Sequence, residues 1–189
     1  MDVLETMGRV LDRTGEVVDK VDDGQLGNQT PCTDWTVRDV INHITGGATM
    51  FATCVEQGSV PDELLPQIMG GDNLGADWKG SYHAASDRAR AAFNAPGALD
   101  KTVKLPFGEM PASIALNIAI MDVITHACDI AKATGQTVDD EELLNTALEV
   151  GHQLVTDDFR TPGVFGAEQP APANATAADK LLAFAGRKV

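Results

Sequence analysis

The sequence predicts an all-α fold, a helical bundle with long connections whose main core is made by four helices. Two observations favour it. Apolar residues recur at three- and four-residue spacing along several long stretches, which places them on one face of a helix. The stretch TVKLPFGEM alternates like a short extended segment, but its Pro106 argues against a central strand.

The first two predicted helices are separated by a turn-rich loop. Residues 2–22 carry apolar side chains at helical spacing, and the loop DDGQLGNQTPC follows them. Asp34 or Thr36 then caps a second helix, which runs through WTVRDVINHITGGATMFATCVEQG. Residues 58–75 are rich in Gly, Pro and Asp, so we expect a long surface loop there.

Further helices are expected in the second half of the chain. One runs over about residues 77–94 and is closed by Pro96 and Gly97. Pro111 is a good first-turn residue for the next helix, which Gly135 ends. Three remaining stretches are expected to be a helix with an acidic start, an irregular segment and a short last helix: DDEELLNTALEVGHQLV, TPGVFGAEQPAPANAT and AADKLLAFAGRK.

Length and composition limit the class of protein. A chain of 189 residues fits one domain, 1–189, with a substantial core, and 43% hydrophobic residues exclude global disorder. The 14 basic residues stand against 28 acidic ones, a formal net charge of -14. This balance repels phosphate backbones and anionic membrane surfaces, so we expect no nucleic-acid or membrane partner.

The termini and the cysteines indicate a cytoplasmic protein. The N-terminal MDVLETMGRVLDR lacks the apolar run of a secretory signal, and no segment approaches the roughly 20 apolar residues of a membrane span. The three cysteines are odd in number and widely spaced, which argues against a disulfide framework.

The stretch MDVITHACDI places three charged or titratable residues in an apolar run. Asp122, His126 and Asp129 lie four and three residues apart, so a helix stacks them on one face. Buried, unpaired charges cost several kcal/mol each, and something must therefore compensate them.

Asp122 and His126 have the spacing with which a helix binds a metal ion through two side chains. A catalytic zinc site needs a third protein ligand and leaves one position open. His43 is the best candidate, and two glycines, Gly46 and Gly47, follow it in the same predicted helix. Each costs about 1 kcal/mol there relative to Ala, a cost that close approach of another helix or of a ligand would explain.

Spacing alone leaves other interpretations open. His43 alone fits a hydrogen-bonded core residue, and Asp122 with His126 fits a buried ion pair that fixes helix packing. Asp129 fits a residue that orients His126 or bonds a cofactor, and equally a capping or surface acid. Cys128 fits a buried structural thiol better than a nucleophile, and Trp35 fits a packing anchor better than a ligand-stacking ring.

Three stretches, TPCTDWTVRDVINHITGG, MDVITHACDIAKATG and LLAFAGRK, resemble the actinobacterial-type metal-binding family of the DinB-like superfamily. That superfamily includes the N-terminal domain of mycothiol-dependent maleylpyruvate isomerase and several thiol transferases. The resemblance covers nearly the whole chain. It implies an up-and-down four-helix bundle that holds one divalent ion, zinc or nickel, through His43, Asp122 and His126.

Three departures from the isomerase accompany the resemblance. Asp122 stands where the isomerase has the longer Glu, and Cys128 stands where many relatives carry Trp. The isomerase has an additional C-terminal domain, for which this chain leaves no room, so isomerase activity itself is not expected while metal binding is.

The leading hypothesis is a metal-dependent enzyme that acts with a small-molecule thiol and an electrophilic substrate. A divalent ion lowers the pKa of a bound thiol, and the thiolate then attacks an electrophilic carbon in an S-transferase or isomerase-like reaction. The resemblance implies that the thiol is mycothiol. A hydrolase that activates water, a non-haem iron site, and a non-catalytic metal or small-ligand binding module are the alternatives. Neither a catalytic residue nor a choice between monomer and homodimer follows from the sequence.

Overall fold

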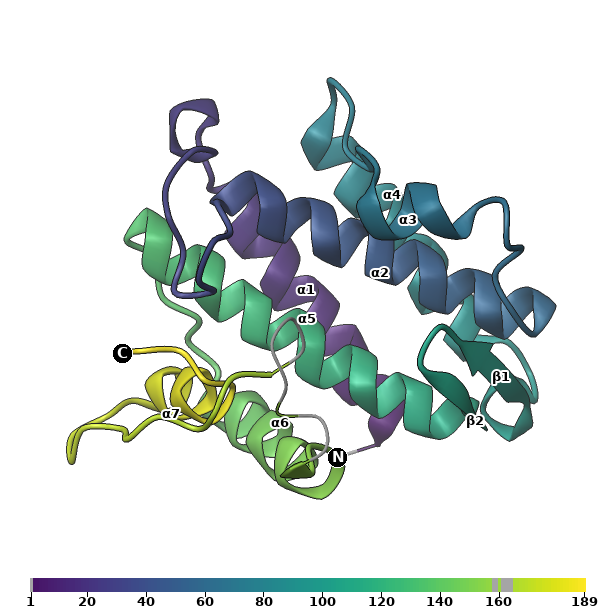
Figure 1. Cartoon of the computed structure of the whole chain (residues 1–189). Coiled ribbons are helices and arrows are strands. Elements are labelled where there is room, and N and C mark those ends of the chain that lie inside the picture. The colour runs from purple at the N-terminus through teal and green to yellow at the C-terminus, as the bar shows by residue number, and fades with distance from the viewer. Residues whose placement is uncertain (1, 158–159, 161–164) are drawn as a thin grey trace. The chain divides into compact units, whose positions relative to one another are not determined.

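A computed structural model describes residues 2–157, 160 and 165–189 of the chain (Figure 1). These residues form two compact units, one of Met1–Leu11 and Ile41–Ile120 and the other of Asp12–Val40 and Met121–Val189. Three helices contribute residues to both units: α1 (Val3–Asp19), α2 (Val37–Gln57) and α5 (Ala112–Thr134). The single domain 1–189 and the up-and-down four-helix arrangement stay predictions.

The first unit also contains α4 (Trp78–Asn94), which begins where the sequence indicates. The Asp77 side chain caps it by accepting a hydrogen bond from the Gly80 backbone N–H. One face of α4 is buried, and at its centre the Tyr82 hydroxyl donates to the Leu11 carbonyl. The short 3-10 helix η2 (Ala98–Asp100) follows α4.

The prediction that residues 58–75 form a plain loop is wrong, because α3 (Leu65–Gly70) lies within it. Ile68 of α3 is buried, and the Asn42 side chain of α2 donates to the Gly71 carbonyl and accepts from the Asn73 N–H. These tertiary contacts stabilise a helix too short for its periodicity to be read from a segment rich in Gly and Pro.

The fold is mostly helical, with seven α-helices in the described residues, and one β-hairpin modifies the all-α prediction. Strand β1 (Thr102–Leu105) pairs antiparallel with β2 (Gly108–Pro111), and Leu105 faces Gly108. Pro106 lies in the turn between them, where its missing N–H breaks no ladder hydrogen bond. Val103 and Leu105 are buried, so one face of the hairpin contributes to the core.

The second unit contains the 3-10 helix η1 (Asp23–Gln25), α6 (Glu141–Leu154) and α7 (Ala177–Phe184). Figure 1 shows α6 and α7 side by side, and Gly151 of α6 faces the Phe184 ring so closely that a Cβ there would lie 2.6 Å from it. The irregular segment expected at 161–176 lies partly outside the described residues, and its part 165–176 contains no helix or strand.

The loop between α1 and α2 is tied to the C-terminal end of α5. The side chains of Gln25 and Asn28 donate to the Thr134 and Ala133 carbonyls, which have no partner further along the helix. Thr36, not Asp34, caps α2: its hydroxyl accepts from the Asp39 N–H, and the Asp39 carboxylate accepts from the Thr36 N–H. The loop therefore has a fixed position beside the C-terminal half of α5.

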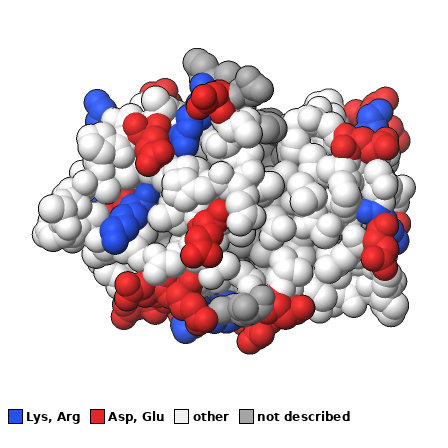
Figure 2. Space-filling view, turned by 90° about the horizontal axis from the view of Figure 1, so that it is seen from below, with Lys and Arg blue, Asp and Glu red and all other residues white. Residues whose placement is uncertain are grey.

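Helix α5 corrects the expectation that no segment reaches the length of a membrane span. Ala112–Thr134 is long and apolar enough to cross a membrane, by length and composition only, but 78% of its most apolar stretch is buried within the structure. A buried core helix can have the same length and apolar composition as a membrane span, so α5 is weak evidence for a membrane. On the face shown in Figure 2, basic side chains lie singly and mostly next to acidic ones.

Candidate metal centre

The centre of the site is one stretch of α5 in the second unit, where two carboxylates flank the ring of His126. The His126 Nδ1 atom lies 3.0 Å from Asp129 Oδ2, and Nε2 lies 3.6 Å from Asp122 Oδ1. The spacing predicted that these three residues share a face of the helix, and the structure brings them together. His126 is buried, while the Asp122 side chain is 27% exposed.

Asp129 is fully buried and is compensated by a second residue, Arg187, just beyond α7. Arg187 Nη2 donates to Asp129 Oδ2 at 3.0 Å and Nε donates to Oδ1 at 3.4 Å, so the guanidinium contacts both carboxylate oxygens. Burial lowers the pKa of Arg187, but Asp129, together with smaller contributions from Cys32 and Asp122, raises it, so that the pKa is raised overall. The alternative that Asp129 is a surface acid is therefore excluded.

This arrangement determines how the imidazole of His126 is used. A carboxylate only accepts hydrogen bonds, so His126 Nδ1–H is the donor to Asp129. Nε2 then faces Asp122. A histidine that ligates a metal through one nitrogen usually donates its other N–H to a carboxylate or a carbonyl in this way.

The loop before α2 supplies two more side chains to the site. The Trp35 ring stacks on His126 with 5.6 Å between centroids and an interplanar angle of 22°. A turn fixes this position, because the Trp35 N–H donates to the Cys32 carbonyl and the Thr30 hydroxyl donates to the Trp35 carbonyl. Trp35 thus covers one face of the imidazole, a contact that its position before a helix did not reveal.

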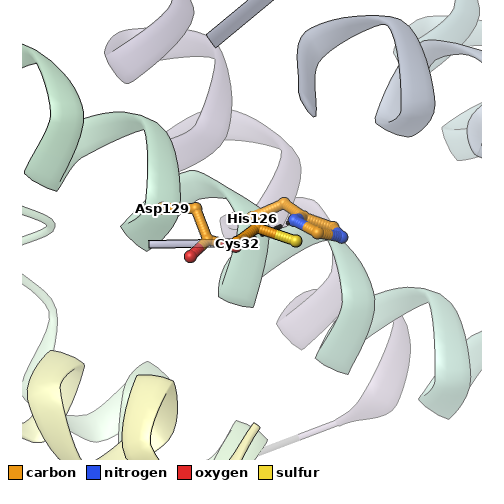
Figure 3. A group of neighbouring side chains, drawn as sticks. All are labelled: Cys32, His126 and Asp129. Carbon is orange, nitrogen blue, oxygen red and sulfur yellow. Dashed lines mark hydrogen bonds and ion pairs between the residues drawn. The ribbon is translucent and has the colours of Figure 1, made fainter. Parts of the chain in front are cut away.

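Cys32 is a site residue that the sequence analysis missed. Figure 3 shows its side chain together with His126 and Asp129, and one ligand atom from each lies within 4.8 Å of the others. Burial raises the pKa of the Cys32 thiol to about 11, with Arg187 opposing the rise and Asp129 and Asp122 adding to it. The stretch TPCTDW contains Cys32 and Trp35, and it is the one sequence signal that pointed here.

The two sides of His126 are not equally suited to a cation. A metal ion shared by Cys32, His126 and Asp129 would need carboxylate oxygens that already accept from Arg187, and it would lie close to the guanidinium charge. The Asp122 carboxylate also acts on the guanidinium, because it raises the pKa of Arg187, but as a smaller cause than Asp129. In the second unit, Oδ1 of Asp122 lies 3.6 Å from Nε2 of His126, and the two are candidate ligand atoms.

His43 lies on α2 in the first unit and is half-buried. The adjacent Asn42 holds residues 71 and 73 by hydrogen bonds, and a Cβ on Gly46 would lie 2.5 Å from the Ile68 carbonyl oxygen. Close backbone approach thus explains Gly46. A Cβ on Gly47 would meet nothing within 4 Å, so that reason does not extend to it. The participation of His43 in a metal site stays a prediction.

Cys128 is buried on α5, and burial raises the pKa of its thiol, with Asp129 and Asp179 adding to the rise. A thiol in these surroundings stays protonated and is a weak nucleophile, as expected of a structural cysteine. The two remaining histidines, His83 and His152, make ring contacts with Tyr82 and Phe184.

The structure is that of a mostly helical protein with a candidate metal site, in which two carboxylates flank one histidine. Comparison with known proteins identifies its family. The mycothiol maleylpyruvate isomerase N-terminal domain family matches residues 7–131, and the chain belongs to this family. Two proteins of Mycobacterium tuberculosis, from strains CDC 1551 / Oshkosh and ATCC 25618 / H37Rv, are each 37% identical to it over 195 residues. The alignments cover 100% of both chains, and both relatives are described as uncharacterized.

Two solved structures share the fold at low sequence identity. A crystal structure of the mycothiol-dependent maleylpyruvate isomerase matches with a TM-score of 0.62 and 20% identity, over 76% of this chain and 65% of that one. The structure of a histidine-to-alanine variant of that isomerase matches with a TM-score of 0.68 and 18% identity, over 86% of this chain and 71% of that one. The chain thus spans about two thirds of the isomerase structures that it matches.

Proposed function

We propose that this protein binds one divalent metal ion and uses it to activate a low-molecular-weight thiol of the mycothiol type, as a thiol S-transferase or an isomerase-like enzyme. His43, Asp122 and His126 would hold the ion, zinc or nickel, in an up-and-down bundle of four main helices. Membership of the family and the shared fold of the isomerase structures support this proposal.

One observation carries the metal part of the proposal: Nε2 of His126 and Oδ1 of Asp122 lie 3.6 Å apart, with Asp129 bonded to the other ring nitrogen. With the hydrogen on Nδ1, Nε2 presents a lone pair towards a carboxylate oxygen, and two such acceptors repel each other unless a cation or a proton lies between them. Two ligand atoms bound to one tetrahedral zinc ion lie about 3.3 Å apart, which follows from ligand bonds of about 2.0–2.1 Å. The observed separation fits this geometry after a small adjustment.

The neighbouring residues have separate tasks in this proposal. Asp129 orients His126, and Trp35 covers one face of the imidazole and limits access of water. A bound divalent ion would supply a lowered thiol pKa, so that thiolate forms near neutral pH. The thiol of Cys32, with its pKa raised to about 11, stays protonated and is a poor nucleophile, which favours an external thiol as the attacking group.

The remaining parts of the proposal rest on the sequence and on the family together. The partners would be a small-molecule thiol and an electrophilic substrate, with no nucleic acid and no membrane, in the cytoplasm. The protein would act as a monomer or a homodimer.

The first test is metal content by elemental analysis of protein purified without a His-tag, then loaded with zinc or nickel and dialysed. We expect about one ion per chain in the wild type, and its loss in His126→Ala, Asp122→Asn and His43→Ala. His152→Ala and His83→Ala are matched controls, because these histidines contact Phe184 and Tyr82 rather than the candidate site, and both should retain the ion. Circular dichroism checks that every variant is folded.

The outcomes separate the parts of the proposal. Wild-type protein without metal after loading would overturn it, and so would a folded His126→Ala that keeps the ion. Loss in His126→Ala and Asp122→Asn but retention in His43→Ala would remove His43 from the ligand set.

Turnover is tested by incubating metal-loaded protein with mycothiol and maleylpyruvate, the substrate named for the isomerase structures, or with a monohalobimane as a general electrophile. Loss of the electrophile that needs the thiol, the metal and His126 together would support an enzyme. One tightly held ion with no thiol-dependent reaction of either electrophile would favour a non-catalytic binding module instead.

A further inference from the structure

Arg187 has an unusual position for a residue near the end of the chain, because its guanidinium is buried. It makes two hydrogen bonds to Asp129, from Nη2 at 3.0 Å and from Nε at 3.4 Å, and Nη1 donates to the Ala185 carbonyl at 2.7 Å. Burying a guanidinium costs several kcal/mol unless a charged partner offsets it. Asp129 is that partner, and Asp129 is also the residue bonded to His126 Nδ1.

The segment after α7 is shaped so that the chain turns Arg187 back towards α5. Gly186 has a φ of +90°, a conformation that suits glycine, and its N–H donates to the Ala183 carbonyl while the Arg187 N–H donates to Leu182. A Cβ on Gly186 would lie 2.6 Å from the Gly166 Cα, so a larger residue does not fit. The closing Ala-Gly-Arg of the helix is thus a cap that determines the direction of the Arg187 side chain.

We propose that Arg187 is a positioning residue for the candidate metal centre: by holding both oxygens of Asp129, it fixes the hydrogen of His126 on Nδ1 and so keeps Nε2 available towards Asp122. The part that concerns the hydrogen on His126 stands on the contacts above, and only its consequence for metal binding rests on the proposed function.

The two-point contact is what makes Arg187 suitable for this role. Asp129 has a carboxylate that rotates about its Cβ–Cγ bond, and a single contact would leave that rotation open. The planar guanidinium holds both oxygens in one orientation, which a lysine, with a single compact charge, does not do. With Asp129 held, its Oδ2 atom lies 3.0 Å from Nδ1, whereas Asp122 Oδ1 lies 3.6 Å from Nε2, so the hydrogen of the imidazole stays on Nδ1.

Arg160 offers a matched control. It lies in the same unit and also fastens the end of α7, because its Nη1 donates to the Phe184 carbonyl at 3.0 Å and to the Gly166 carbonyl at 2.9 Å. Both hydrogen bonds go to these carbonyls rather than to Asp129. Arg160→Met therefore tests the loss of an arginine that supports α7 without the loss of the Asp129 contact.

The first readout is the tautomer of His126 in metal-free protein, measured from two-bond ¹⁵N–¹H correlations of the imidazole at pH 8. The signal is assigned with His126→Gln. We expect the wild type and Arg160→Met to carry the hydrogen on Nδ1, and Arg187→Met to show a mixture of tautomers. Arg187→Lys keeps a charge beside Asp129 and so guards against misfolding, and its tautomer should lie between those of the wild type and Arg187→Met.

The second readout is zinc affinity, measured by competition with a chromophoric chelator. Loss of a residue that orients a ligand histidine typically lowers metal affinity about 10–100-fold, which we expect for Arg187→Met. Arg187→Lys should recover part of this loss, and Arg160→Met should stay within about 3-fold of the wild type.

Three results would overturn the proposal: a hydrogen on Nε2 in the wild type, an unchanged tautomer in folded Arg187→Met, or an equal change in Arg160→Met. If the tautomer shifts as expected but the wild type binds no zinc, the positioning of His126 stands and the proposed function fails. If zinc binds tightly and the tautomer is unaffected by Arg187, the proposed function survives and this inference fails.

Discussion

Two turns of α5, one beginning at Asp122 and the other ending at Asp129, each place a carboxylate beside the ring of His126, but in opposite environments. The Asp129 carboxylate is fully buried and accepts from both Arg187 and His126. The Asp122 side chain is 27% exposed and lies 3.6 Å from Nε2, beyond hydrogen-bond distance. Nδ1 of His126 therefore faces a buried carboxylate that also binds Arg187, whereas Nε2 faces the partly exposed carboxylate of Asp122.

This difference in environment indicates different roles for Asp122 and Asp129. A buried carboxylate with a guanidinium partner is costly to disturb, which suits the orienting role that we propose for Asp129. A carboxylate that is partly exposed and faces an imidazole lone pair is able to exchange partners. The sequence spacing pairs Asp122 with His126 but leaves the role of Asp129 open, and only its surroundings show that Asp129 is buried against Arg187.

The largest expected effect is a difference in stability between Asp129→Ala and Asp122→Ala. Removing Asp129 leaves the Arg187 guanidinium buried without its charged partner, and we expect the free energy of unfolding to fall by about 3–5 kcal/mol. Removing the partly exposed Asp122 should cost less than about 1 kcal/mol. Urea unfolding in the presence of a chelator, followed by circular dichroism, measures both values.

The double variant Asp129→Leu with Arg187→Met is the control, because it removes both buried charges together and should be more stable than Asp129→Ala alone. If Asp129→Ala and Asp122→Ala lost the same free energy of unfolding, the two carboxylates beside His126 would not differ in burial and pairing as described.

A smaller effect is expected from the third surface of His126, the face covered by Trp35. The stacked pair has 5.6 Å between ring centroids, and aromatic pairs of this kind contribute about 0.5–1.5 kcal/mol beyond buried area. A double-mutant cycle with Trp35→Leu and His126→Leu should therefore give a coupling energy in that range. A cycle that pairs Trp78→Leu with His126→Leu is the matched control, and a similar coupling there would mean that the stack contributes nothing specific.

The helices were predictable where local chemistry marks their ends. Asp77 caps α4, and the turn at Gly135, with a φ of +71°, ends α5, both as the sequence indicates. Helix α3 and the β-hairpin were not predicted, because each is short and is stabilised by contacts with distant residues. Asn42 fixes the end of α3, and the Gly58 carbonyl accepts from Lys104 of β1.

The site divides in the same way. Spacing predicted the grouping of Asp122, His126 and Asp129, and the cost of a buried charge predicted that something compensates it. The sequence did not predict that Arg187 is the compensating residue. It lies 58 positions from Asp129, and any basic residue of the chain could have been the partner. Cys32 was missed for the same reason: the turn that ends at Trp35 brings it to α5, and no periodicity marks that contact.

The smallest effect concerns the ion pair between Lys132 of α5 and Asp179 of α7. This pair sharpens the comparison because it is exposed, whereas Asp129 and Arg187 are buried. Lys132 Nζ donates to Asp179 Oδ1 at 2.6 Å, and this hydrogen bond is the main cause that lowers the pKa of Asp179 below its ordinary value of 3.8, against a smaller opposing effect of burial. A lowered pKa means that the contribution to stability is present above about pH 4 and is lost as the pH falls through the folded-state value.

We therefore expect Lys132→Ala to raise the pKa of Asp179, measured by ¹³C NMR of its carboxyl group, and to cost less than about 1 kcal/mol at pH 7, measured by urea unfolding. Lys180→Ala, on the same helix as Asp179, should leave that pKa in place. A loss of several kcal/mol in Lys132→Ala would show that exposure does not separate the two pairs, and the contrast between a structural and an exchangeable acid on α5 would then lose its physical basis.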